Sequence, residues 1–65
     1  MIQIRKFYHR DNFQIGLYFG FEDELKQKAR SIGARWSQTN KCWYVAYNKD
    51  NYDKIIRIFV GYIIF

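Results

Sequence analysis

The side chains best suited to chemistry in this 65-residue chain are its arginines, lysines and tyrosines. These residue types bind phosphate groups and stack on bases. The single histidine, His9, and the single cysteine, Cys42, have no neighbours at spacings typical of a catalytic or zinc site. The glycines also lack the spacing of a phosphate-binding loop. The sequence therefore predicts no catalytic residue, no metal site and no cofactor.

The charge of the chain is strongly basic and unevenly distributed. Eleven lysines and arginines against six acidic residues give a net charge of +5 and a pI near 9.6. Such a balance in a small domain favours a polyanionic partner. Most of the acids fall at 22–24 and 50–53, where two helices are expected to begin and where the helix dipole favours them. The positive charge is therefore expected on the strands and their loops, where the following residues lie: Arg5, Lys6, Arg35 and Lys41.

Two strand pairs and two helices are needed to position these side chains. Residues 2–9 and 13–19 alternate between apolar and polar types, which predicts a β-hairpin, and residues 34–37 and 41–47 predict a second one. Residues 21–32 have the apolar spacing of a helix that ends at Gly33, and a second helix is expected after Asn48. The predicted fold is α+β, in the order ββαββα, with an antiparallel sheet and both helices on one face. Residues 1–60 would form one domain and residues 61–65 an apolar tail.

Alternation along the strands then predicts which side chains share the sheet face that the helices leave open. If Ile4 and Leu17 are buried, Arg5 and Tyr18 point away from the core. Trp36 and Trp43 are expected in the core. The predicted binding residues are Arg5, Tyr18, Arg35, Lys41 and Tyr44, with Tyr44 exposed and Cys42 beside it. A slip of one residue in the register of the last strand would exchange Tyr44 with Trp43 and Val45.

A longer motif supports this interpretation. Residues 33–47 read GARWSQTNKCWYVAY, and residues 47–52 supply a Y-x-K-x-N-Y pattern. This region resembles the N-terminal arm-type DNA-binding domain of tyrosine recombinases, the phage-type integrases of mobile elements. Similar segments occur in small modules attached to other DNA-processing enzymes. The resemblance extends over residues 2–59, whereas the tail VGYIIF departs from the polar linker expected there.

The resemblance implies a non-catalytic, duplex DNA-binding module that serves integration and recombination, with the catalytic residues of the recombinase in another domain. The alternatives are a dimerisation module that associates through the apolar tail, a binder of single-stranded nucleic acid, and a structural remnant without a ligand. The lone cysteine and the charged N-terminal segment predict a cytoplasmic location, and the tail is too short to span a membrane.

Overall fold

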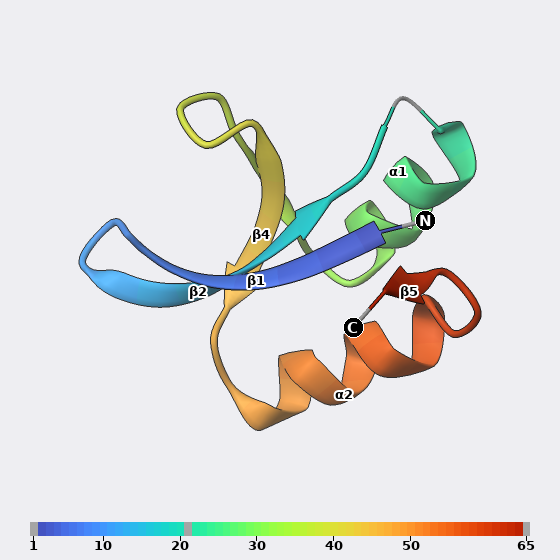
Figure 1. Cartoon of the computed structure of the whole chain (residues 1–65). Helices are drawn as coiled ribbons and strands as arrows, with labels where there is room; N and C mark the ends of the chain where they lie inside the picture. Colours follow the sequence, from blue (N-terminus) through green and yellow to red (C-terminus); the bar gives the residue numbers. More distant parts are fainter. Residues whose placement is uncertain (1, 21, 65) are drawn as a thin grey trace.

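Two pairs of strands, each followed by a helix, succeed one another along the chain in the order that the sequence predicts (Figure 1). The computed structural model describes residues 2–20 and 22–64. The α+β class and the ββαββα order are confirmed, and a short fifth strand follows. The elements are β1 (Ile2–His9), β2 (Asn12–Tyr18), α1 (Asp23–Ser31), β3 (Arg35–Ser37), β4 (Cys42–Ala46), α2 (Lys49–Ile58) and β5 (Ile63–Ile64).

The strands form one sheet in the order β3-β4-β2-β1-β5. The first four are antiparallel to their neighbours, and β2 joins the two hairpins by pairing with β4. β5 pairs in parallel with the start of β1, where Ile2 is the partner of Ile63. Tyr62 also donates a hydrogen bond to Glu24 at 3.0 Å. The described part of the predicted tail thus extends the sheet and contacts α1.

The start of α2 and the end of α1 have the capping residues that the sequence predicts, Asn48 and Gly33. The Asn48 side chain accepts the backbone N–H of Asn51 at 2.8 Å and caps α2. At the end of α1, Gly33 has a φ of +82° and donates to Arg30 O, while Ala34 donates to Ala29 O. This pair of bonds is the Schellman arrangement, which requires the left-handed conformation that glycine adopts without strain. The chain can therefore turn sharply from α1 into β3.

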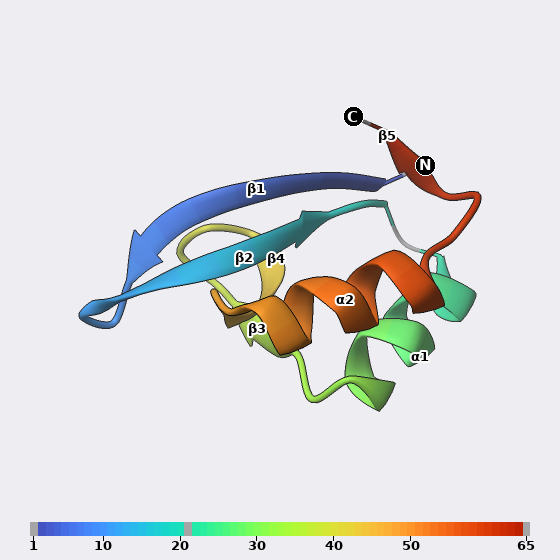
Figure 2. The ribbon, with the colours of Figure 1, turned by 90° about the horizontal axis from the view of Figure 1, so that it is seen from below.

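Both helices cover the same face of the sheet, and the core lies between (Figure 2). The core face of the strands contributes Ile2, Ile15, Leu17 and Val45, while the helices contribute Leu25, Ala29, Ile55 and Phe59. The prediction that the two helices share one face is confirmed. Among residues 2–20 and 22–64, no helix lies over the opposite face of the sheet, which faces the viewer in Figure 1.

Candidate functional site

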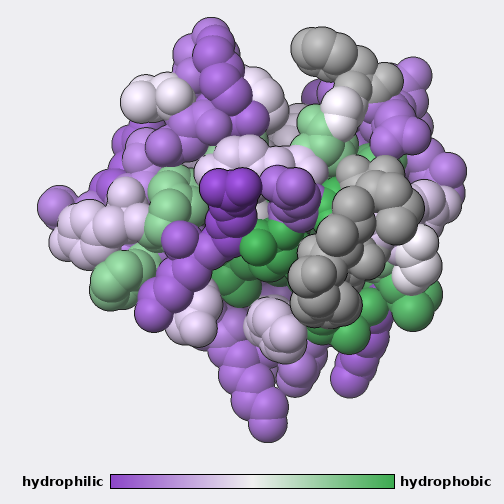
Figure 3. All heavy atoms as spheres, in the orientation of Figure 1, coloured by the Kyte–Doolittle hydropathy of each residue, from purple (hydrophilic) through white to green (hydrophobic). Residues whose placement is uncertain are grey.

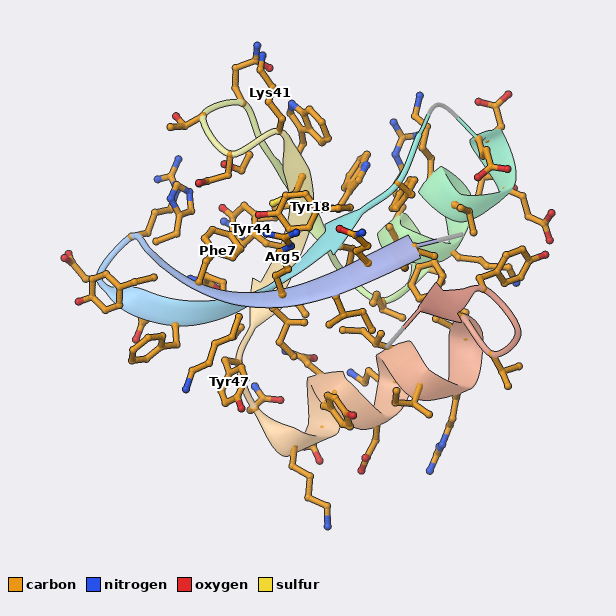
Figure 4. All side chains as sticks on the ribbon, in the orientation of Figure 1. Arg5, Phe7, Tyr18, Lys41, Tyr44 and Tyr47 are labelled. Carbon is orange, nitrogen blue, oxygen red and sulfur yellow. The ribbon has the colours of Figure 1, made fainter. Side chains whose placement is uncertain are left out.

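Four of the predicted binding residues lie on the face of the sheet that the helices leave open, which we call the open face. Arg5 pairs with Gly16, Gly16 with Tyr44, and Tyr44 with Arg35, so these residues form one row across β1, β2, β4 and β3. Tyr18 lies one step further along β2, and the Arg5 guanidinium is 5.7 Å from the centre of its ring (Figure 4). With strands about 4.8 Å apart, the two arginines are separated by roughly 14 Å along the row.

Aromatic rings form a partial second layer on this face. The Phe7 and His9 rings pack edge-on against Tyr44, with centroids 6.2 and 5.2 Å away. As a result, only 8% of Tyr44 is exposed, and the prediction that Tyr44 would be exposed is wrong. The cause is that Gly16, on the intervening strand β2, has no side chain, so two rings of β1 reach Tyr44 on a strand that is not its neighbour. Tyr44 therefore supports the layer from below, and Phe7 and Tyr18 form its partly exposed surface.

The space for this layer comes from Gly16. A Cβ atom at this position would lie 2.9 Å from Tyr18 Cε1 and 3.0 Å from Phe7 Cε1. Both distances are shorter than an ordinary carbon–carbon contact of about 3.5–4.0 Å. The two rings thus approach the backbone of β2 more closely than any residue with a Cβ atom would allow.

We expect Gly16→Ala to displace the rings and to lower the free energy of unfolding by about 1–3 kcal/mol, as overpacking usually does. Urea denaturation measures the loss, and ring-current shifts between Phe7 and Tyr44 report the displacement. The matched control is Gly20→Ala, because nothing lies within 4 Å of a Cβ atom there. Identical stability and shifts in both variants would contradict this account of Gly16.

Positive charge gathers at one end of the open face. A shallow hollow of about 280 Å³ has Arg10 and Arg35 in its lining, together with Asn12, Gln14 and Tyr44. Arg10 and Asp11 form the two-residue turn of the β1–β2 hairpin with φ angles of +54° and +63°. This turn places Arg10 in the same hollow as Arg35. In the space-filling view onto this face, hydrophilic side chains surround smaller areas of apolar surface (Figure 3).

Polar contacts hold the hairpin in place over the open face. Gln14 Nε2 donates to the His9 carbonyl oxygen at 3.0 Å, and His9 Nδ1 lies 3.4 Å from Asn40 Nδ2 in the β3–β4 turn. Two groups on the open face are kept in their neutral form. Burial raises the pKa of the Tyr18 hydroxyl, with a further contribution from Cys42 beside it. Burial also raises the pKa of the Cys42 thiol. Tyr18 is therefore neutral at physiological pH and keeps its O–H as a hydrogen-bond donor, and Cys42 is a neutral thiol.

The fifth predicted residue, Lys41, does not lie with the other four. It occupies the β3–β4 turn with a φ of +55°, away from Arg5 and Tyr44 (Figure 4). It lines a separate hollow between this hairpin and α1, together with Trp36. Trp36 itself is 46% exposed, so the prediction that it belongs to the core is wrong. The reason is that β3 is an edge strand of the sheet, with a neighbouring strand on one side only.

Sequence reasoning missed Phe7, His9 and Arg10 as members of the open face. The alternation that placed Arg5 there also extends to Phe7 and His9, so the signal was present in the pattern of β1. The packing of these two rings on Tyr44 depends on the pairing of β2 with β4, which alternation within β1 does not reveal. For Arg10, a turn position, no periodic signal exists.

A family model described as "Domain of unknown function (DUF5710)" matches residues 21–55, from α1 to most of α2. No curated protein and no solved structure matches the chain. Within the part that the structure describes, no group of three or more histidine, cysteine or carboxylate side chains is arranged to hold a metal ion. None of its helices is long and apolar enough to cross a membrane.

Proposed function

The chain belongs to the DUF5710 family, and we propose that it binds duplex DNA through the open face of its sheet. The observation that carries the proposal is the row of Arg5, Gly16, Tyr44 and Arg35. Its two arginines are exposed and flank an aromatic layer. Their separation of roughly 14 Å is close to the ~12 Å width of the major groove, so each guanidinium can reach the phosphates on one side of the groove.

The charge distribution supports the same partner. Arg5, Arg10 and Arg35 lie on or beside the open face, whereas five of the six acidic residues lie in or next to the helices on the other side. Phosphate contacts from such arginines orient a protein on DNA, while side chains between them contact base edges. The partly exposed side chains of Tyr18 and Phe7 occupy those intermediate positions in this proposal, and strands are known to enter the major groove.

The resemblance to the arm-type domains of tyrosine recombinases extends the proposal to biological context. The GARW and KCWYV segments form β3, its turn and β4, and thereby supply Arg35 and Tyr44 of the row. In this proposal the chain is a non-catalytic, cytoplasmic module that brings an integrase or another DNA-processing enzyme of a mobile element to its DNA. The chemistry then resides in another domain.

The test is a binding titration of labelled duplex DNA at several salt concentrations. If two phosphates are contacted, the logarithm of the binding constant should fall by about 1.8 per tenfold increase in salt. Between about 50 and 200 mM salt this corresponds to roughly a tenfold loss of affinity. Absence of binding at the lowest salt would refute the proposal.

A competition experiment distinguishes binding of duplex DNA from binding of single-stranded nucleic acid. An unlabelled single strand of the same sequence should displace the duplex poorly. If it competes better than the duplex, the aromatic layer serves single-stranded nucleic acid. Sedimentation of the free protein completes the comparison, because a concentration-dependent dimer without DNA affinity would favour the dimerisation module.

A further inference from the structure

The hollow between α1 and the β3–β4 hairpin has a composition that the open face does not share. Its volume is about 600 Å³, within the range of small-molecule sites. It lies on the helix side of β3 and β4, because Trp43 pairs with the core residue Leu17 and Trp36 pairs with Trp43. The residues that line it are Phe19, Gly20, Lys26, Arg30, Trp36, Lys41 and Trp43, with no carboxylate among them.

One wall of this hollow is an exposed indole held in a defined orientation. Trp36 packs edge-on against Trp43 with centroids 5.7 Å apart, and its Nε1 donates to Gln38 Oε1 at 3.0 Å. The ring is nevertheless 46% exposed. A large apolar ring that is both exposed and fixed has already lost its rotational freedom, so it provides a prepared surface for stacking.

The other wall is cationic. Lys26 and Arg30 are one turn apart on α1, and Lys41 extends from the hairpin turn opposite. The Arg30 guanidinium lies 5.7 Å from the centre of the Trp43 ring, which orients it beside the aromatic wall. An anionic group in the hollow would thus meet positive charge from both elements.

We propose that this hollow binds a nucleoside phosphate, with the base stacked on Trp36 and the phosphate held by Lys26, Arg30 and Lys41. A simple anion would make no use of the indole, and an apolar ligand would leave three cations without a partner. A nucleotide combines a flat aromatic ring with a phosphate, and base–aromatic stacking accepts any base. The source is either a free nucleotide or an unpaired nucleotide of a strand. The inference is independent of duplex binding, because it rests on different side chains.

Calorimetric titration with AMP, with a short 5′-phosphorylated oligoadenylate and with inorganic phosphate tests this site. We expect AMP or the oligonucleotide to bind and phosphate alone to bind much more weakly. Tighter binding of AMP would identify the free nucleotide as the ligand, and tighter binding of the oligonucleotide would identify a strand. The tryptophan emission should change in parallel, because both indoles of the chain line the hollow.

Trp36→Leu should weaken nucleotide binding at least fivefold, the lower limit of what stacking on an aromatic ring contributes. Arg30→Gln should also weaken nucleotide binding, because it removes a cation that holds the phosphate. This second variant tests the site even if Trp36→Leu fails to fold. Lys54→Gln, on the exposed surface of α2, is the matched control and should bind normally. The double variant Arg5→Ala/Arg35→Ala should also bind AMP normally, which separates this site from the open face.

Three results would overturn the inference. They are equal affinity for phosphate and AMP, unchanged affinity in both the Trp36 and Arg30 variants, and absence of binding at millimolar nucleotide. Loss of duplex binding without loss of AMP binding in Arg5→Ala/Arg35→Ala would support two separate sites.

Discussion

Phe59→Ala is expected to lower the free energy of unfolding by about 3–5 kcal/mol, a large part of the stability of this protein. Phe59 follows the last turn of α2, and none of its surface is exposed. Removing a buried phenylalanine costs about 3–5 kcal/mol. At about 0.05–0.15 kcal/mol per residue, a chain of this size has a total stability of roughly 3–10 kcal/mol. One substitution can therefore remove most of it.

Urea denaturation followed by circular dichroism measures this effect directly. The control is Val60→Ala at the next position, where 72% of the side chain is exposed and the expected change is within about 0.5 kcal/mol. Two-state unfolding of Phe59→Ala at the same urea concentration as the unmodified chain would contradict the central place of Phe59 in the core.

The double variant Arg5→Ala/Arg35→Ala is expected to lose most of its affinity for duplex DNA while it keeps its fold. Both arginines are exposed and lie at the two ends of the row, so neither contributes to the core. Each lost phosphate contact should reduce by about one the slope of the logarithm of the binding constant against the logarithm of the salt concentration. At low salt the affinity should fall roughly tenfold for each arginine, which corresponds to about 1.4 kcal/mol.

The double variant Lys49→Ala/Lys54→Ala provides the charge-matched control. It removes the same net charge from α2, and both lysines are exposed on the helix side of the molecule. Its affinity should fall much less, since it loses only the long-range attraction to DNA. If the two double variants lose equal affinity, the binding depends on net charge and the open face has no special role.

Local patterns in the sequence were sufficient to predict the first six elements of this fold, from β1 to α2. Alternation with a period of two assigned Ile15 and Leu17 to the core, and this is a strong signal because a slip of one residue would expose both. The caps at Asn48 and Gly33 depend only on neighbouring backbone groups. The same periodicity placed Arg5, Tyr18 and Arg35 on one face, since each lies next to a residue on the core side.

The features that local patterns did not predict depend on which strands are neighbours. The pairing of β2 with β4 determines that Tyr44 lies beside Gly16, and the absence of a side chain at Gly16 then lets Phe7 and His9 cover Tyr44. β5 joins the sheet through β1, where Ile63 pairs with Ile2 from the other end of the chain.

The sequence by itself therefore determined the first six α+β elements, their order and the alternation of side chains between the two faces of each strand, because these follow from backbone periodicity and short-range hydrogen bonds. Only the tertiary structure decided the exposure of Trp36, the burial of Tyr44 and the position of Lys41 across from α1. Exposure depends on which other side chains lie above a residue, and that is set by the strand order and by the side chains of the neighbouring strands.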